Sequence, residues 1–114
     1  MKAIINTVDG MKEVELSASY KYKGVDVFLT IEYPYAIASE WSTGCRITSE
    51  DMLEDRGDND YISIIALKAN AVLDIAIANG RMFKAIEKMV KEHGIANEGE
   101  MPLIGDVVIA EVSK

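Results

Sequence analysis

The sequence contains few of the residues on which common catalytic and metal sites depend. Its 114 residues include one cysteine, Cys45, and one histidine, His93. One cysteine cannot form an internal disulfide or a multi-cysteine zinc site, and one histidine argues against a histidine-based metal centre. Sparse cysteine usage suits a reducing compartment, so we expect a cytoplasmic protein.

Long hydrophobic runs are also missing. Near the N-terminus three apolar residues stand together before Asn6, which is too short for the apolar part of a secretion signal. The most apolar stretch, residues 61–80, is interrupted by Lys68, Asn70 and Asp74. It therefore lacks the roughly 18 to 20 unbroken apolar residues typical of a membrane span. We expect it to be a buried helix, and we expect no membrane partner.

Positive charge is scarce. Twelve Lys and Arg residues stand against 19 Asp and Glu residues, a net charge of −7 at pH 7. Binding of nucleic acid depends mainly on Lys and Arg neutralising phosphates, so we expect no direct binding of DNA or RNA. A protein partner with a basic surface is favoured instead. Much of the acidic excess lies within residues 50–60, in Glu50, Asp51, Glu54, Asp55, Asp58 and Asp60, where Arg56 is the one basic residue.

The first third of the chain has the two-residue alternation of β-strands. A strand over 3–8 is followed by Asp9-Gly10, a pair that favours a type I′ hairpin turn. A third strand over 25–33 is predicted to expose Asp26, Thr30 and Glu32, with Phe28 as the exception to its alternation. It ends at Pro34, which lacks an N–H for the ladder. The second strand is predicted to bury Val14, Leu16, Ala18 and Tyr20 and to expose Glu13, Glu15, Ser17 and Ser19.

Residues 36–47 fit neither the strand nor the helix period cleanly, and Gly44 indicates a bulge or a turn. We favour a fourth strand that ends near Thr48, with a helix as the alternative. Thr48 or Ser49 would then cap a short helical turn through 50–55.

From Tyr61 the apolar spacing changes to about 3.6, with Asp60 as the predicted N-cap. The same phase continues across Asn79-Gly80 to Val90. This predicts either one long helix, straight or kinked, or two helices joined at Gly80, because an interior glycine costs about 1 kcal/mol against alanine. Gly94 is the predicted C-cap. A final strand over 104–112 would add to the sheet.

Together these patterns predict one α+β domain over residues 1–114, with an antiparallel sheet of about four or five strands packed in two layers on a long helix. Its parts are a strand-rich region 1–48, an acidic connector 49–60, a helical region 61–94 and the final strand 104–112. The first half of the helix is apolar nearly all round, and a single sheet covers only one side of a helix. Either the strands curl around it or a second copy of the chain covers it.

The acidic segment also suggests a metal. Asp55, Asp58 and Asp60 with Asn59 could supply several oxygens to calcium, but their spacing does not fit an EF-hand. Hydrated and helix-capping acids explain the segment equally well, so we expect no metal and no other cofactor. Cys45 and His93 are the one pair available for cysteine-type catalysis, and a histidine at a helix C-terminus is already favourable on electrostatic grounds. We therefore expect no enzymatic activity.

Two further groups of side chains are candidates for binding. One is a basic stripe on residues 81–93, which could contact an acidic partner or could be a solvated helix face. The other is aromatic, since Tyr and Trp are enriched in the hot spots of protein interfaces. The basic residues are Arg81, Lys84, Lys88 and Lys91, and the aromatic residues are Tyr20, Tyr22, Tyr33, Tyr35 and Trp41.

These features favour a small acidic, non-enzymatic module that binds another protein. The predicted contacts are the six acids of residues 50–60 with Tyr35 and Trp41, and Glu40 lies nearby in sequence. The acids would occupy a lysine- and arginine-rich groove and block nucleic acid there. In size and charge alone the chain is similar to small acidic inhibitors encoded by phages and mobile elements, including DNA mimics and anti-CRISPR proteins. The alternative is a self-associating regulatory or structural subunit that uses the apolar helix as its oligomer interface.

Overall fold

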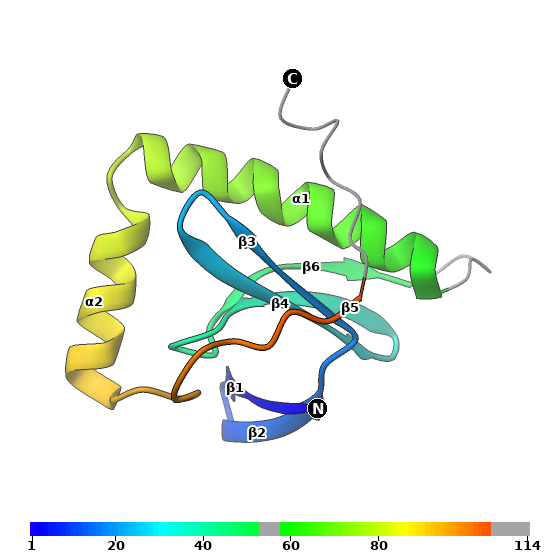
Figure 1. Cartoon of the computed structure of the whole chain (residues 1–114), viewed down its shortest axis with the longest axis horizontal. Coiled ribbons are helices and arrows are strands. Elements are labelled where there is room, and N and C mark those ends of the chain that lie inside the picture. The colour runs from blue at the N-terminus through cyan, green and yellow to red at the C-terminus, as the bar shows by residue number, and fades with distance from the viewer. Residues whose placement is uncertain (53–57, 106–114) are drawn as a thin grey trace.

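The computed structural model of the chain describes residues 1–52 and 58–105, and for 58–60 it describes the backbone alone. This part of the chain forms six strands followed by two helices, which confirms the predicted α+β class (Figure 1). The strands are β1 (Lys2–Thr7), β2 (Gly10–Glu15), β3 (Ala18–Tyr22), β4 (Val25–Glu32), β5 (Tyr35–Glu40) and β6 (Arg46–Asp51), and the helices are α1 (Asp58–Ala78) and α2 (Met82–His93). Segment 53–57 and most of the predicted final strand, residues 106–112, lie outside the described residues.

The strands form two antiparallel sheets: β1 pairs with β2, and β3, β4, β5 and β6 follow one another in chain order. The predicted N-terminal hairpin is confirmed, although its turn lies at Val8 and Asp9, because Thr7 pairs with Gly10. Gly10 has a φ of 109°, a conformation that favours glycine.

The predicted second strand is two strands in different sheets, because the chain changes partners between Glu15 and Ala18. The N–H of Leu16 donates to the carbonyl of Met1, whereas the N–H of Ser17 donates to the carbonyl of Leu29 in β4. The alternation of buried residues continues through this break, so the burial predicted for Leu16 and Ala18 is confirmed.

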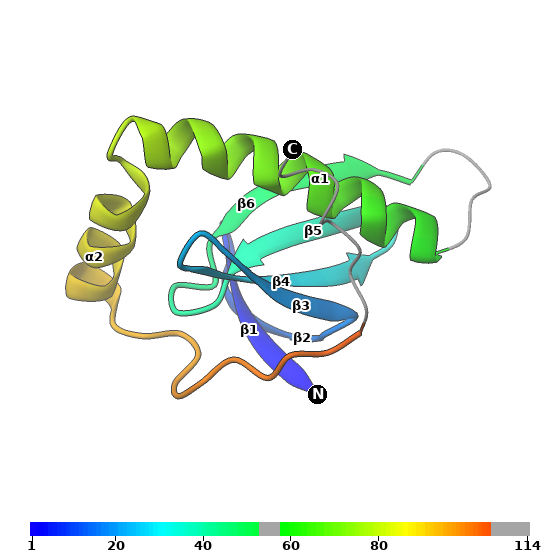
Figure 2. The same ribbon diagram turned by 45° about the horizontal axis from the view of Figure 1, so that its top comes forward.

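Helix α1 covers one face of the four-stranded sheet (Figure 2). Ile65, Ala69 and Leu73 recur at the spacing of one helix face and are fully buried. They belong to one apolar cluster with Val27 and Leu29 of β4. This is the predicted two-layer core.

The opposite face of the same sheet is covered by the β1–β2 hairpin and by residues around Met101. Phe28 lies on this face, where its ring meets Trp41 edge-on at a centroid distance of 5.8 Å. Both faces of β4 are therefore buried, which explains why Phe28 departs from the predicted alternation. The prediction that Thr30 points to solvent is wrong for the same reason, since Thr30 is buried.

Residues 36–47 belong to two strands, β5 and β6, joined by a turn at 41–45. The side chain of Glu40 organises this turn, because its carboxylate accepts hydrogen bonds from the backbone N–H groups of Ser42 and Thr43 at 2.8 and 2.9 Å. The preference for strand over helix is confirmed, but the single predicted strand is wrong, because two strands joined by a turn take its place. However, β6 runs through Thr48 and Ser49 to Asp51, so these two residues do not cap a helical turn.

The helical region is two helices rather than one. The chain turns at Asn79 and Gly80, where Gly80 has a φ of 69°, and α2 then runs in a different direction from α1 (Figure 1). Helix α1 begins at Asp58, which places Asp60 inside its first turn rather than at the predicted N-cap. The predicted C-cap is confirmed, since Gly94 has a φ of 80° and its N–H donates to the carbonyl of Val90.

Polar contacts fix α1 on the sheet beside the apolar core. The Tyr20 hydroxyl hydrogen-bonds to the Asn70 side chain, with 2.8 Å between the oxygens, and burial raises the Tyr20 pKa.

By length and composition, the described window Tyr61–Ala78 of α1 could also cross a membrane, and 33% of this window is buried in the fold.

Asp74 on α1 accepts hydrogen bonds from the Lys23 ammonium at 2.6 Å and from the Tyr22 hydroxyl at 2.8 Å. The bond from Lys23, followed by that from Tyr22, holds the pKa of the Asp74 carboxyl below its usual value. Because the folded-state pKa is lowered, the resulting stability is fully present above the unfolded pKa of about 3.9 and is lost as the pH falls through the folded pKa.

We therefore predict that Asp74→Asn makes the stability less dependent on pH across the acidic range below about 4. Urea unfolding at a series of pH values, combined with an NMR titration of the carboxyl groups, would measure this. An Asp74 midpoint at or above that of free aspartate would contradict the prediction.

Candidate functional site

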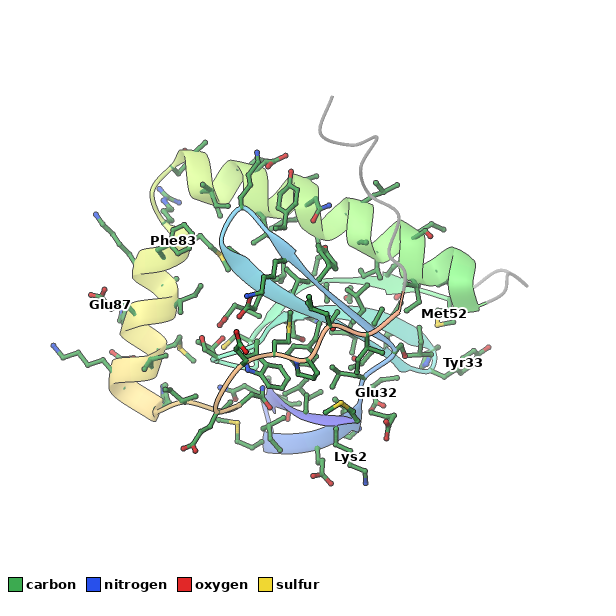
Figure 3. The ribbon with its side chains drawn as sticks, in the orientation of Figure 1. Lys2, Glu32, Tyr33, Met52, Phe83 and Glu87 are labelled. Carbon is green, nitrogen blue, oxygen red and sulfur yellow. The ribbon has the colours of Figure 1, made fainter. Side chains whose placement is uncertain are left out.

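The candidate interaction surface lies where the β4–β5 turn meets the end of β6. Pro34 lacks an N–H, so β4 ends at Glu32 and the chain reverses through Tyr33 and Pro34, which are joined by a cis peptide bond. Figure 3 shows Tyr33 and Met52 at one end of the molecule, far from Phe83 on α2. We name this surface the acidic–aromatic end. Its described members are Glu32, Tyr33, Tyr35, Glu50 and Asp51.

Two exposed tyrosines and one exposed carboxylate meet at this end. Tyr33 and Tyr35 are 79% and 46% exposed, and Tyr35 lies directly opposite Asp51 in the β5–β6 ladder. The N–H of Met52 donates to the carbonyl of Pro34 at 2.7 Å, which ties the end of β6 to the turn. Tyrosine combines a large apolar ring with a polar tip, a combination common in protein interfaces.

The carboxylates of the acidic–aromatic end differ in their ion pairing. Glu32 pairs with Lys12 at 2.6 Å, and Glu50 pairs with Lys68 of α1 at 3.1 Å. Asp51 is exposed and forms no ion pair with any described residue. Among the described acids here, Asp51 therefore has its charge free for a partner.

The structure brings some of the predicted contact residues together. Tyr35, Glu50 and Asp51 share the acidic–aromatic end, although Glu50 faces α1 and is already paired. Glu54 and Asp55 lie outside the described residues. Asp58 and Asp60 belong to the first turn of α1, where the side chains are not described.

Trp41 does not belong to this surface. It is 7% exposed, packs on Phe28, and its indole N–H donates to the carbonyl of Gly99 at 3.0 Å. We therefore remove Trp41 from the predicted contact residues. Tyr33 was one of the aromatic candidates but was not among the predicted contacts. Its position directly before Pro34, at the end of a strand, is the signal that indicates an exposed turn.

A second candidate surface is the outer side of α1. Leu67, Val72 and Ile75 are all exposed there, and Ile75 reaches 66%. Lys68 and Asp74, the charged side chains of this helix between residues 61 and 78, are both paired with residues of the sheet region. The outer side of α1 is thus an apolar surface with its neighbouring charges neutralised.

Helix α2 has the predicted basic stripe, and Arg81, Lys84, Lys88 and Lys91 are all exposed. None of the α2 residues is fully buried. On the apolar side of α2, Met82, Ile86 and Met89 line a hollow of about 220 Å³. The C-terminal half of α1 and the start of β6 form its other walls. This volume is smaller than the roughly 300–1,000 Å³ of most ligand pockets.

Cys45 and His93, the pair considered for catalysis, form no hydrogen bond with each other. Cys45 lies near the Asn6 amide at 4.0 Å, whereas His93 at the end of α2 lies near Glu92 at 3.9 Å. Among the described side chains, those of residues 1–52 and 61–105, no three His, Cys, Asp or Glu residues are grouped so as to hold a metal ion. The alternative of calcium at Asp55, Asp58 and Asp60 falls outside the described side chains.

Comparisons of the chain with protein-family models, with curated proteins and with solved structures found no match.

Proposed function

We propose that the protein is a small acidic, non-enzymatic module that binds a protein partner with a basic surface through its acidic–aromatic end. In the specific form of this proposal, the acids of residues 50–60 occupy a lysine- and arginine-rich groove of the partner and exclude nucleic acid from it. The protein would then act as an inhibitor of the DNA-mimic or anti-CRISPR-like type, in the cytoplasm.

The observation that carries the proposal is the arrangement of Tyr33, Tyr35 and Asp51. Two exposed rings can supply the apolar contact of an interface, and an unpaired carboxylate beside them can pair with a basic side chain. The acidic segment of the sequence continues directly from Asp51. Clustered negative charge of this kind steers association toward positively charged partners.

Affinity capture from a nuclease-treated cell lysate, followed by a binding titration of the captured protein, would test the proposal. Asp51→Lys should weaken binding at least about tenfold at physiological salt, because the reversed charge is repelled by a basic groove. Tyr33→Ala should weaken it by about 30-fold if this ring is a hot spot worth about 2 kcal/mol.

Asp9→Lys is the matched control for the charge change, because Asp9 is exposed in the β1–β2 turn. It should leave the affinity unchanged within about twofold at physiological salt. Equal affinity of wild type, Asp51→Lys and Tyr33→Ala would refute the acidic–aromatic end as the binding surface.

A second candidate function is that of a self-associating regulatory or structural subunit, and the exposed apolar side of α1 favours it. Exposed apolar patches on a folded protein often mark interaction surfaces. If two copies pair through α1, Ile75→Lys should convert the dimer to a monomer in light scattering at micromolar concentration. The matched control is Val8→Lys, which changes a fully exposed valine in the β1–β2 turn. A wild-type protein that is monomeric at that concentration would exclude this function.

A further inference from the structure

A larger hollow, of about 400 Å³, lies where β1 meets the C-terminal half of β5 and the start of β6. Its volume is within the roughly 300–1,000 Å³ typical of pockets for small molecules. Ile5 and Asn6 line it from β1, Ile37 and Ser39 line it from β5, and Arg46 lines it from β6. Ser39 is opposite Phe28 in the β4–β5 register, so this hollow is on the sheet face that carries the Phe28–Trp41 contact, away from α1.

Ser39 places an unpartnered polar atom at this hollow. The residue is 1% exposed, and its hydroxyl forms no hydrogen bond with the described part of the chain. Buried hydroxyls are normally hydrogen-bonded, because burial without a partner is unfavourable. A group that enters the hollow and accepts a hydrogen bond from Ser39 would remove this cost.

Arg46 adds a positive charge at the same place. It is the β6 partner of Ser39, and cross-strand partners share a face of the sheet. Arg46 is an exposed residue, and its guanidinium makes no ion pair or hydrogen bond with any described side chain. By contrast, Lys12, Lys23 and Lys68 each pair with a carboxylate of the chain. In a chain of net charge −7, Arg46 is thus a cation left available to an external anion.

The walls of this hollow are held by backbone contacts. The N–H of Asn6 donates to the carbonyl of Gly44 at 2.8 Å, which joins β1 to the β5–β6 turn. A Cβ atom at Gly44 would lie 2.6 Å from the carbonyl oxygen of Ile4, and Gly44 has a φ of 69°. Only glycine allows this close approach, so the two walls keep a fixed separation.

We propose that this hollow binds a small monocarboxylate. The carboxylate would lie on Arg46, whose planar guanidinium matches it with two parallel hydrogen bonds, and would accept a further bond from the Ser39 hydroxyl. A short apolar body would lie against Ile5 and Ile37. A doubly charged phosphate is disfavoured, because Arg46 is the one cationic side chain among the lining residues and the net charge of the chain repels anions.

The test uses hexanoate, with hexanamide as a neutral match of the same length. In a titration of the isotope-labelled full chain followed by NMR, hexanoate should shift the amide signals of Asn6, Ser39, Gly44 and Arg46. We expect a Kd on the order of 1 mM, as befits so small a ligand. Hexanamide should bind at least about tenfold more weakly, since it lacks the charge that pairs with Arg46.

Variants assign the binding to the two polar groups. Arg46→Gln should weaken hexanoate at least about tenfold, whereas Arg81→Gln, which removes an exposed arginine next to α2, should have no effect. Ser39→Ala should weaken hexanoate several-fold and at the same time stabilise the ligand-free protein, since an unpartnered buried hydroxyl is removed. This second variant tests the site even if Arg46→Gln perturbs the fold.

Three results would overturn this inference: no saturable shifts with hexanoate, equal binding of hexanoate and hexanamide, or unchanged binding in Arg46→Gln and Ser39→Ala. Tighter binding of inorganic phosphate to the same amides would overturn the choice of a monocarboxylate. The inference does not rest on the acidic–aromatic end, so Asp51→Lys should bind hexanoate like the wild type.

Discussion

Replacing Phe28 with alanine is expected to lower the free energy of unfolding by about 3–5 kcal/mol. Phe28 is fully buried, and its ring fills the space between β4, Trp41 and the β1–β2 hairpin. The loss combines the transfer of a large apolar side chain with the cavity that remains, because the surrounding backbone cannot fully collapse. Urea unfolding followed by tryptophan fluorescence would measure it, since Trp41 contacts the substituted ring.

Phe83→Ala is the matched control, because Phe83 on α2 is 49% exposed. The same substitution there should cost no more than about 1 kcal/mol. Near-equal losses in the two variants would contradict the assignment of a second core beneath the hairpin.

Asn97→Asp is expected to cost about 3 kcal/mol at neutral pH, although it changes few atoms. The buried Asn97 side chain accepts a hydrogen bond from the N–H of Ile4 and donates to the carbonyls of Ile4 and Trp41, at 2.7, 2.9 and 2.7 Å. It thereby joins the segment after α2 to β1 and to the β5–β6 turn. A carboxylate would keep the first bond but would place negative charge against two carbonyl oxygens.

The penalty of Asn97→Asp should depend on pH in a defined direction. A carboxyl that is buried against two acceptors has its folded-state pKa raised, so the penalty is complete above that pKa and shrinks as the pH falls below it. Asn79→Asp, in the exposed turn between the helices, is the control and should change stability by less than about 0.5 kcal/mol. Equal stabilities of the two variants at neutral pH would contradict the role given to Asn97.

The sequence predicted buried residues better than it predicted strand boundaries. Leu16 and Ala18 are both buried as expected, yet the chain passes from one sheet to the other between them. The alternation of apolar and polar residues cannot reveal this break, because Leu16 belongs to one apolar core and Ala18 to the other, and both cores require an apolar residue at every second position. Ser19 was expected to face solvent but is buried, since the segment at Pro102 covers it and accepts a hydrogen bond from its hydroxyl.

The second core could not be predicted, because it depends on where the hairpin lies in space. The apolar character of Phe28 and Trp41 is plain in the sequence, but their contact is made across separate elements of the sheet and its turn. The end of α1 was more accessible to prediction. Two helices joined at Gly80 were one of the two alternatives, and the positive φ of Gly80 ends α1 there although the apolar spacing of the sequence continues.

The candidate sites show the same limit. Tyr33 could have been included, because the following Pro34 ends a strand and forces the chain to turn. The pairing of Ser39 with Arg46 could not be predicted, because the β5–β6 register shifts by a bulge between Ala38 and Ser39. Without knowledge of the bulge, alternation gives no means of deciding which β6 residue shares a face with Ser39.

The most direct measurement is a competition assay between this protein and nucleic acid for the captured partner. If the acids of residues 50–60 occupy the partner's basic groove, increasing amounts of the protein should displace labelled nucleic acid completely. The required concentration should rise with salt and should rise further for Asp51→Lys. A stable ternary complex of the protein, its partner and nucleic acid would contradict that account.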